Sequence, residues 1–316
     1  MKRRLLFLAV SVFLLFCCGV LGQGCRFSST EKNFTSRGLE YTLNKDGKGY
    51  TVTGIGECLD KKIVIPSAHQ KKPVVGIADY VFLDCYFIES IVVPSSVKTF
   101  GLQVFRGCKN LKELTVPFLG ESASAAAANT GTLKSFFGYA PESVPESLEK
   151  VTVTSGTIVG ASAFYGCKFI NTVILPDEVT EIRSHAFAEC ENLFSFSFPE
   201  KLKKIESHAF WLSGLLEAEL PDGLTEIEAA AFSHSLLSSV KLPKNLKVIQ
   251  ALVFSDCGIK KITIPYAVQR IERNAFWGCF NLTSVTILNP ETVVEESAFE
   301  GCNQLDESDI VFGFPS

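Results

Sequence analysis

Seven cysteines recur at one place in a repeated pattern, and they are the residues most open to chemistry in this sequence. Each follows a phenylalanine by three residues, and members of adjacent repeats are 22 or 23 residues apart. Metal sites need ligands that converge on one point, with spacings such as C-x₂-C, whereas these residues are spread one to a repeat. The seven are Cys85, Cys108, Cys167, Cys190, Cys257, Cys279 and Cys302.

Stacked repeats would place neighbouring cysteine Cα atoms about 4.7–4.9 Å apart. Parallel side chains nevertheless keep the Cβ atoms too far apart for an unstrained disulfide. Ser213 and Ser235 replace cysteine in two repeats, which favours a limit on size over a redox role. We therefore predict a buried structural cysteine ladder, whose thiols act as compact apolar groups. Outside the ladder, Cys25 and Cys58 are able to pair in an oxidising compartment.

No other set of reactive residues has the spacing of a catalytic or metal site. His185 and His208 lie at equivalent positions of consecutive repeats, and we expect them to stack on the surface. Neither flanking repeat has a histidine at this position, so a third metal ligand is missing. The sequence has no Gly-rich phosphate loop, H-E-x-x-H or G-x-S-x-G motif. We therefore expect no enzyme activity and no cofactor or metal.

The residues that could do chemistry are positioned by an internal repeat. Its unit reads L-x-x-V-x-I-P-x-x-V-x-x-I-x-x-x-A-F-x-x-C, and its phenylalanines are spaced 23, 59, 23, 23, 22, 22, 22 and 23 residues apart. The alternating apolar residues predict a short strand, which proline ends because it lacks an N–H. Since 22 residues cannot bury such a face alone, the units must stack into a solenoid with one continuous core. The phenylalanines are Phe82, Phe105, Phe164, Phe187, Phe210, Phe232, Phe254, Phe276 and Phe299.

Over residues 38–305 this unit resembles the BspA-like class of leucine-rich repeats. Residues 38–43 and 46–50 are similar to the N-terminal hairpin of that family, and Asp46-Gly47 is a turn signal between two apolar runs. The resemblance implies a leucine-rich-repeat solenoid of 22–23-residue units, built mainly from short strands with few or no long helices. It also implies export to the cell surface or beyond, and a role in attachment and protein binding without catalysis.

The first 24 residues have the features of a signal peptide. Lys2, Arg3 and Arg4 precede an apolar run over residues 5–16, which is shorter than the roughly 20 residues needed to span a bilayer. Cleavage after Gly24 would leave Cys25 first, and the preceding residues resemble a relaxed bacterial lipobox. Three outcomes stay open, namely lipidation of Cys25, simple secretion and an uncleaved anchor. Lipidation would exclude a Cys25–Cys58 disulfide.

After the signal we expect an N-terminal cap over 25–65, the solenoid over 66–305 and a C-terminal cap or tail over 306–316. An irregular insertion at about 118–146 accounts for the 59-residue spacing, and residues 136–139 read as a degenerate corner of one irregular repeat. Such insertions map to loops, which either carry recognition or vary freely.

The charge balance bears on the class of partner. The chain has 30 basic and 34 acidic residues, and removal of residues 1–24 leaves 27 against 34, a net charge of −7. This balance disfavours nucleic-acid binding, which needs a basic stripe. We expect an extracellular or host protein as partner, with membrane contact only through a lipid anchor or an uncleaved signal. The alternative is a structural component of the cell envelope or matrix without a discrete ligand.

The surface most suited to a partner is the outward side of the predicted strands. It is mixed and mostly neutral, and aromatic anchors are Phe194, Trp211 and Trp277, because aromatic residues dominate interface hot spots. The aligned outward positions are Val92, Thr115, Ile174, Ser197, Glu219, Lys241, Thr263 and Thr286.

Overall fold

The computed structural model describes residues 35–122, 131–138, 140 and 143–313. The chain divides into residues 1–34 and 35–316, and the second unit contains all of the described residues. The predicted signal segment and Cys25 lie outside the described residues. The described chain is a β-solenoid of about 11 turns without an α-helix, which confirms the predicted fold class.

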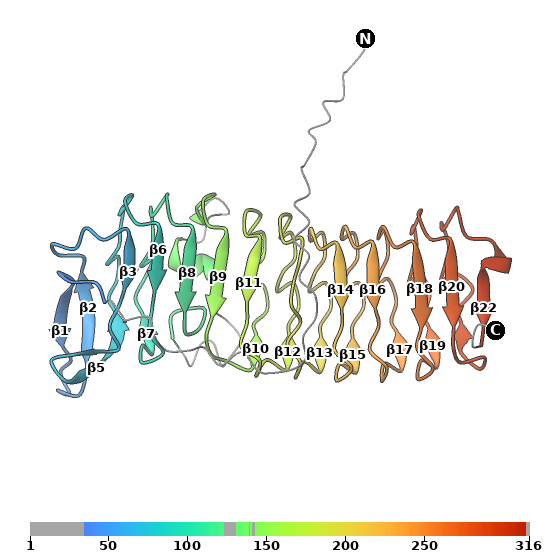
Figure 1. Ribbon diagram of the computed structural model, residues 1–316, viewed down its shortest axis with the longest axis horizontal. Coiled ribbons are helices and arrows are strands. Elements are labelled where there is room, and N and C mark those ends of the chain that lie inside the picture. The colour runs from blue at the N-terminus through green and yellow to red at the C-terminus, as the bar shows by residue number, and fades with distance from the viewer. Residues whose placement is uncertain (1–34, 123–130, 139, 141–142, 314–316) are drawn as a thin grey trace, which may run out of the picture. The chain divides into compact units, whose positions relative to one another are not determined.

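One face of the solenoid consists of short parallel strands, with one strand in nearly every turn (Figure 1). Their inward residues are apolar and buried, as in β18, where Ile262 and Ile264 point into the core. The ladder is continuous within three groups, β3-β6-β8-β9-β11, β14-β16 and β18-β20-β22. The strands are β3 (Lys62–Val64), β6 (Ser90–Val92), β8 (Glu113–Val116), β9 (Lys150–Val153), β11 (Thr172–Ile174), β14 (Glu217–Glu219), β16 (Ser239–Lys241), β18 (Lys261–Ile264), β20 (Ser284–Ile287) and β22 (Ile310–Phe312).

The second face carries shorter strands, mostly of two residues, on the other side of the core. Most of them present one buried β-branched or aromatic residue inward, such as Ile182 and Ile205. They are β5 (Lys72–Ile77), β7 (Thr99–Phe100), β10 (Ile158–Val159), β12 (Glu181–Ile182), β13 (Lys204–Ile205), β15 (Glu226–Ile227), β17 (Val248–Ile249), β19 (Arg270–Ile271) and β21 (Val293–Val294).

At the N-terminal end, β1 (Glu40–Leu43) and β2 (Tyr50–Gly54) form the expected antiparallel hairpin. The Gly47 amide donates to the carbonyl of Asn44 at 2.8 Å, so the turn lies where the Asp-Gly signal predicted it. Strand β2 then pairs in parallel with β5. A second antiparallel hairpin joins β4 (Ala68–His69) to β5.

The A-F-x-x-C segment forms the corner at which each turn changes face. Residues two before and two after the phenylalanine have left-handed backbone, with φ from +47° to +60° at the non-glycine positions. This conformation is costly for side chains other than glycine, asparagine and aspartate. Regular stacking nevertheless imposes it in consecutive turns, as at His185, Glu189, His208 and Leu212.

The corner phenylalanines form a column through the core. From Phe164 to Phe299, successive rings lie 5.0–5.6 Å apart between centroids and are inclined by 6–18° to one another. Offset stacking of this kind adds to the burial of the rings. The shared column explains why a turn of 22 or 23 residues is stable only in a stack.

The 59-residue spacing contains one irregular turn, as predicted. Strand β8 pairs directly with β9, so this turn runs from Glu113 to Lys150. Its corner is a 3₁₀ helix, η1 (Leu133–Phe136), which fills the missing place between two regular corners. The Phe105 amide donates to the Phe136 carbonyl and the Leu133 amide to the Ala163 carbonyl, both at 2.9 Å.

The last turn ends in a 3₁₀ helix, η3 (Glu307–Asp309), followed by β22. Strand β22 pairs in parallel with β20, where the apolar tail was expected to cover the final turn. Within the described residues no helix is long and apolar enough to cross a membrane.

Candidate functional site

The seven ladder cysteines are buried and unpaired by disulfides, as predicted. Their thiols fill apolar space and also form hydrogen bonds. In five turns the Sγ atom lies 3.1–3.2 Å from the carbonyl oxygen of the phenylalanine one turn earlier, to which the thiol donates. The pairs are Cys108–Phe82, Cys190–Phe164, Cys257–Phe232, Cys279–Phe254 and Cys302–Phe276.

Burial makes most of these thiols poor nucleophiles, although the hydrogen bond with the Cys279 thiol lowers the pKa of Cys302. Burial raises the pKa of Cys108, Cys167 and Cys257 to about 12, so the reactive thiolate is scarce at neutral pH. The two ladder serines differ, because the Ser235 hydroxyl lies 3.5 Å from the Cys257 sulfur, whereas the buried Ser213 hydroxyl has no hydrogen-bond partner among the described residues. The Ser213 position therefore suits a thiol better than a hydroxyl.

His185 and His208 stack as expected, with centroids 5.0 Å apart and rings inclined by 3°. They are half-buried rather than fully on the surface, since His185 also packs edge-on against Tyr165 and His208 against Trp211. Burial, together with the neighbouring imidazole of His185, lowers the pKa of His208. No group of three or more potential metal ligands occurs anywhere in the described residues.

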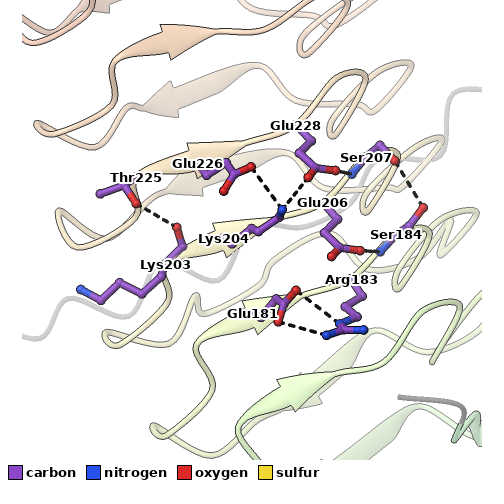
Figure 2. A network of polar contacts seen from close by, with 10 residues as sticks. All are labelled: Glu181, Arg183, Ser184, Lys203, Lys204, Glu206, Ser207, Thr225, Glu226 and Glu228. Carbon is purple, nitrogen blue, oxygen red and sulfur yellow. Dashed lines mark hydrogen bonds and ion pairs between the residues drawn. The ribbon is translucent and has the colours of Figure 1, made fainter. Parts of the chain in front are cut away.

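Carboxylates on the second face bind the turns to one another (Figure 2). Glu206 accepts a hydrogen bond from the Ser184 amide of the preceding turn, and Glu228 accepts one from the Ser207 amide, both at 3.0 Å. Burial raises the pKa of Glu206, and the Ser184 amide opposes this effect. These side chains satisfy amides that the corner would otherwise leave unpaired.

Ion pairs complete this network. Lys204 contacts Glu226 at 3.2 Å and Glu228 at 2.6 Å, and Arg183 lies 3.3 Å from Glu181 (Figure 2). Arg183 and Lys204 therefore pair with carboxylates of their own or the next turn, while the Ser184 amide holds Glu206. The arrangement is a brace between β12, β13 and β15.

The first face presents the outward residues in the predicted register. Val92 aligns with Thr115, Glu219 with Lys241 and Thr263 with Thr286. Three members of this row were missed by the sequence reasoning. They are Val64, beside Val92, Thr152, between Thr115 and Ile174, and Val311, beside Thr286. The L-x-x-V-x-V pattern of residues 148–153 was the signal that would have placed Thr152.

Ser197 departs from the prediction, because residues 195–198 form no strand. None of the four amides donates to a backbone carbonyl of the described chain, and the sheet is interrupted between β11 and β14. Phe196 and Phe198 point inward here and pack on Phe187 and Phe210 with centroids 4.9–5.5 Å apart. Because these rings replace smaller aliphatic residues, they hold this segment out of the ladder.

Phe194 is 47% exposed, and it belongs to a group of exposed apolar side chains on three consecutive turns. We call this group the apolar patch. Between β9 and β14 the outward strand residues are uncharged, while the Glu113–Lys150 and Glu219–Lys241 pairs lie on either side. The members of the apolar patch are Phe169, Ile174, Phe194 and Leu216, each 42–47% exposed.

The other two predicted anchors lie apart from the apolar patch. Trp211 is half-buried at a corner, edge-on to His208. Trp277 is 40% exposed at an equivalent corner, and two further turns, those of Phe232 and Phe254, separate the tryptophans. The three aromatic residues named from the sequence therefore do not form one cluster.

A pocket of about 410 Å³ lies where the irregular turn meets the next regular turn, next to Phe169. Lys134 lies over the Tyr165 ring at 5.2 Å, and the Tyr165 hydroxyl donates to Glu189 at 2.7 Å. Lys134, Tyr165 and Glu189 are thus engaged with one another, and the pocket adjoins the apolar patch at Phe169.

Several solved structures of leucine-rich repeat proteins are similar to this chain. A search of curated proteins found no match. Among solved structures, a leucine rich cell surface protein from Faecalibacterium prausnitzii is 24% identical, with 89% of this chain and 95% of that chain covered and a TM-score of 0.37. A leucine-rich repeat protein from Bacteroides ovatus is 22% identical, with coverage of 89% and 71% and a TM-score of 0.48. The T. pallidum leucine rich repeat protein is 20% identical, with coverage of 86% and 90% and a TM-score of 0.28.

The family comparison is decisive, because it covers nearly all of the described chain. The BspA type leucine rich repeat region matches residues 51–140, 142–258 and 225–313, in six copies. The corners, the phenylalanine column and the cysteine ladder are the structural counterpart of this match. The chain belongs to the BspA-type leucine-rich repeat family.

Proposed function

We propose that this protein is an exported, non-catalytic scaffold that binds another protein through its first face. The observation that carries the proposal is the apolar patch, whose side chains are 42–47% exposed on three consecutive turns. Exposed apolar groups that are contiguous along a surface are typical of interaction sites. The uncharged strand positions around them lower the cost of removing water on contact.

The solenoid supplies the rest of the mechanism. Its turns are fixed by the phenylalanine column and by backbone ladders, so the face is formed before a partner arrives. A rigid surface of this kind loses little conformational entropy on binding, and contacts can spread over many turns. Affinity would then come from Phe194 and its neighbours, and specificity from the charged pairs on either side.

The test is saturable binding of purified residues 26–316 to immobilised extracellular matrix proteins, measured by biolayer interferometry. Phe194→Ser should weaken binding at least tenfold, because it removes an aromatic anchor. Phe280→Ser is the matched control, since Phe280 is 55% exposed but lies outside the apolar patch. Equal affinity of both variants would refute this location. A defined oligomer with a protected first face would instead favour the structural envelope or matrix role.

Export and anchoring belong to the same proposal. The basic residues and apolar run before Gly24 support a signal peptide, and Cys25 is the residue that lipidation would modify. The intact mass of the mature protein tests this, because a diacylglycerol adduct would identify a lipoprotein. A mature chain starting at Cys25 without an adduct would identify simple secretion and would leave Cys58 free to pair.

A further inference from the structure

The irregular turn leaves the second face open at one edge. Where a regular turn would run parallel to β7, this turn forms an antiparallel bridge between Ser122 and Thr99. The Phe100 amide donates to the Glu121 carbonyl at 2.8 Å, so the segment completes β7. Because the chain runs in the opposite direction here, it does not continue the parallel ladder to β10.

In regular turns, the residue just after each second-face strand donates its backbone amide to a backbone carbonyl of the preceding turn. Arg183 donates to Val159 at 3.0 Å, Glu206 to Ile182 at 2.8 Å and Glu228 to Ile205 at 2.9 Å. Gly160 is the equivalent residue beside β10, and its amide has no backbone acceptor among the described residues. The Gln250 amide likewise has no backbone acceptor among the described residues, but the turn before it is regular and carries strand β15.

The free amides of β10 point toward the open edge. Val159 faces the following turn, since its carbonyl accepts the Arg183 amide, and strand residues alternate in direction. The backbone groups of Ile158 therefore face the irregular turn, as does the Gly160 amide. Within the described chain the Ile158 amide also has no backbone acceptor on that side.

A pocket of about 280 Å³ runs along this edge. Residues 155–160 form one wall, and Phe118, Leu119, Val153 and Phe164 contribute apolar side chains. No charged residue is among the described residues that line it. The site thus combines unpaired backbone donors with apolar walls, which favours an uncharged ligand.

We propose that an extended, uncharged peptide segment of a partner protein adds to β10 as a further strand. Its carbonyls accept hydrogen bonds from the Ile158 and Gly160 amides, and one of its amides donates to the Ile158 carbonyl. An apolar side chain facing inward fills the pocket, while the next residue faces solvent. Strand addition at an open sheet edge is a general mode of peptide recognition. This site lies on the second face, so the proposal does not depend on the binding role proposed for the apolar patch.

A fluorescein-labelled Thr-Val-Thr-Val-Thr peptide with blocked ends is a suitable probe. Fluorescence anisotropy should show saturable binding to the purified protein. Amide hydrogen exchange at Ile158 and Gly160 should be fast in the free protein and at least tenfold slower with saturating peptide. A peptide whose central threonine is replaced by proline should bind at least fivefold more weakly, because it lacks one N–H. No saturation, or unchanged exchange at both amides, overturns the proposal.

Two variants at one position isolate the backbone contribution. Ile158→Pro removes the amide hydrogen, and proline is tolerated at an unpaired strand edge. Ile158→Ala keeps that hydrogen and loses the same apolar side chain. We expect Ile158→Pro to bind the probe at least fivefold more weakly than Ile158→Ala, with unfolding temperatures compared to exclude misfolding. Equal affinities would overturn the strand-addition geometry.

Two other occupants of this edge, namely a segment of the chain itself and a second copy of the protein, would give different results. A variant lacking residues 123–130 should bind the probe as the full chain does. If the probe bound only to this variant, the chain's own segment would fill the edge and the proposal would be wrong. A concentration-dependent dimer with protected Ile158 and Gly160 amides would point to a second copy and would also overturn it.

Discussion

Ser213 is a position at which replacing one side-chain oxygen by sulfur should stabilise the solenoid. Its hydroxyl is buried, with the residue 2% exposed, and has no hydrogen-bond partner in the described part of the chain. One turn earlier, the equivalent Cys190 thiol donates to the Phe164 carbonyl at 3.2 Å. We predict that Ser213→Cys stabilises the protein, because the longer C–S bond lets the thiol reach the carbonyl of Phe187.

The magnitude comes from two contributions. An unsatisfied buried hydroxyl costs about 1–3 kcal/mol, and removing it recovers much of that amount. The sulfur fits, since neighbouring turns hold cysteine at this place, and its weak hydrogen bond adds a few tenths of a kcal/mol. We therefore expect a gain of about 2 kcal/mol in the free energy of unfolding. For a chain of this size the unfolding temperature should rise by about 4 °C.

Thermal unfolding followed by circular dichroism measures this shift, with urea unfolding as a second measure. Ser213→Ala separates the contributions, because it removes the hydroxyl without adding a donor, and should give about 1 kcal/mol. Cys190→Ser should have the opposite effect, because it creates a second hydroxyl at a site shaped for a thiol. The reasoning is refuted if Ser213→Cys is neutral or destabilising, or if Ser213→Ala destabilises the protein.

Three further predictions concern the corners, the polar brace and the thiols. Leu212→Gly should stabilise the protein by about 0.5–1 kcal/mol, because Leu212 has a φ of +53°. Leu236 does not have left-handed backbone, so Leu236→Gly should destabilise the protein by about 1 kcal/mol. The urea midpoints of both variants test this difference. Glu206→Gln should stabilise at pH 7 and lose its advantage near pH 3. The folded pKa of Glu206 is raised, so its ionisation costs stability as the pH rises above the ordinary glutamate range. Glu228→Gln, which accepts the same kind of amide but loses its pair with Lys204, should destabilise at pH 7, and equal signs for the two variants would contradict the assignment. Finally, the ladder cysteines should resist Ellman's reagent at pH 8 until guanidinium unfolds the chain; rapid reaction of the native protein would show that they are not buried.

The sequence was sufficient for the fold because one period governs local structure and packing together. Alternating residues such as Leu111, Leu114 and Val116 predict a buried strand, and the recurring phenylalanine predicts a shared core. Stacking then has only one arrangement that buries every copy. The single irregular turn was also predictable, since Phe136 and Phe137 supply a corner where the regular spacing fails.

The candidate sites were less accessible to sequence reasoning. Phe194 was recognised as exposed, but its neighbours Ile174 and Leu216 were not grouped with it, because grouping requires the register between turns. The interruption at residues 195–198 was also missed, since two inward rings displace a segment whose alternation reads as a good strand. Trp211 looked like an anchor, yet it packs at a corner.

What the sequence by itself determined is the period, the family and the burial of the cysteines, because these depend on residue types repeated at fixed intervals. The tertiary structure alone decided where hydrogen-bonding groups are satisfied and where they are not. The thiol of Cys190 has a carbonyl partner one turn away, Ser213 has none, and the Gly160 amide faces an edge that no parallel strand of the described chain covers. Such pairings depend on the distance and direction between atoms of different turns, which no single repeat contains.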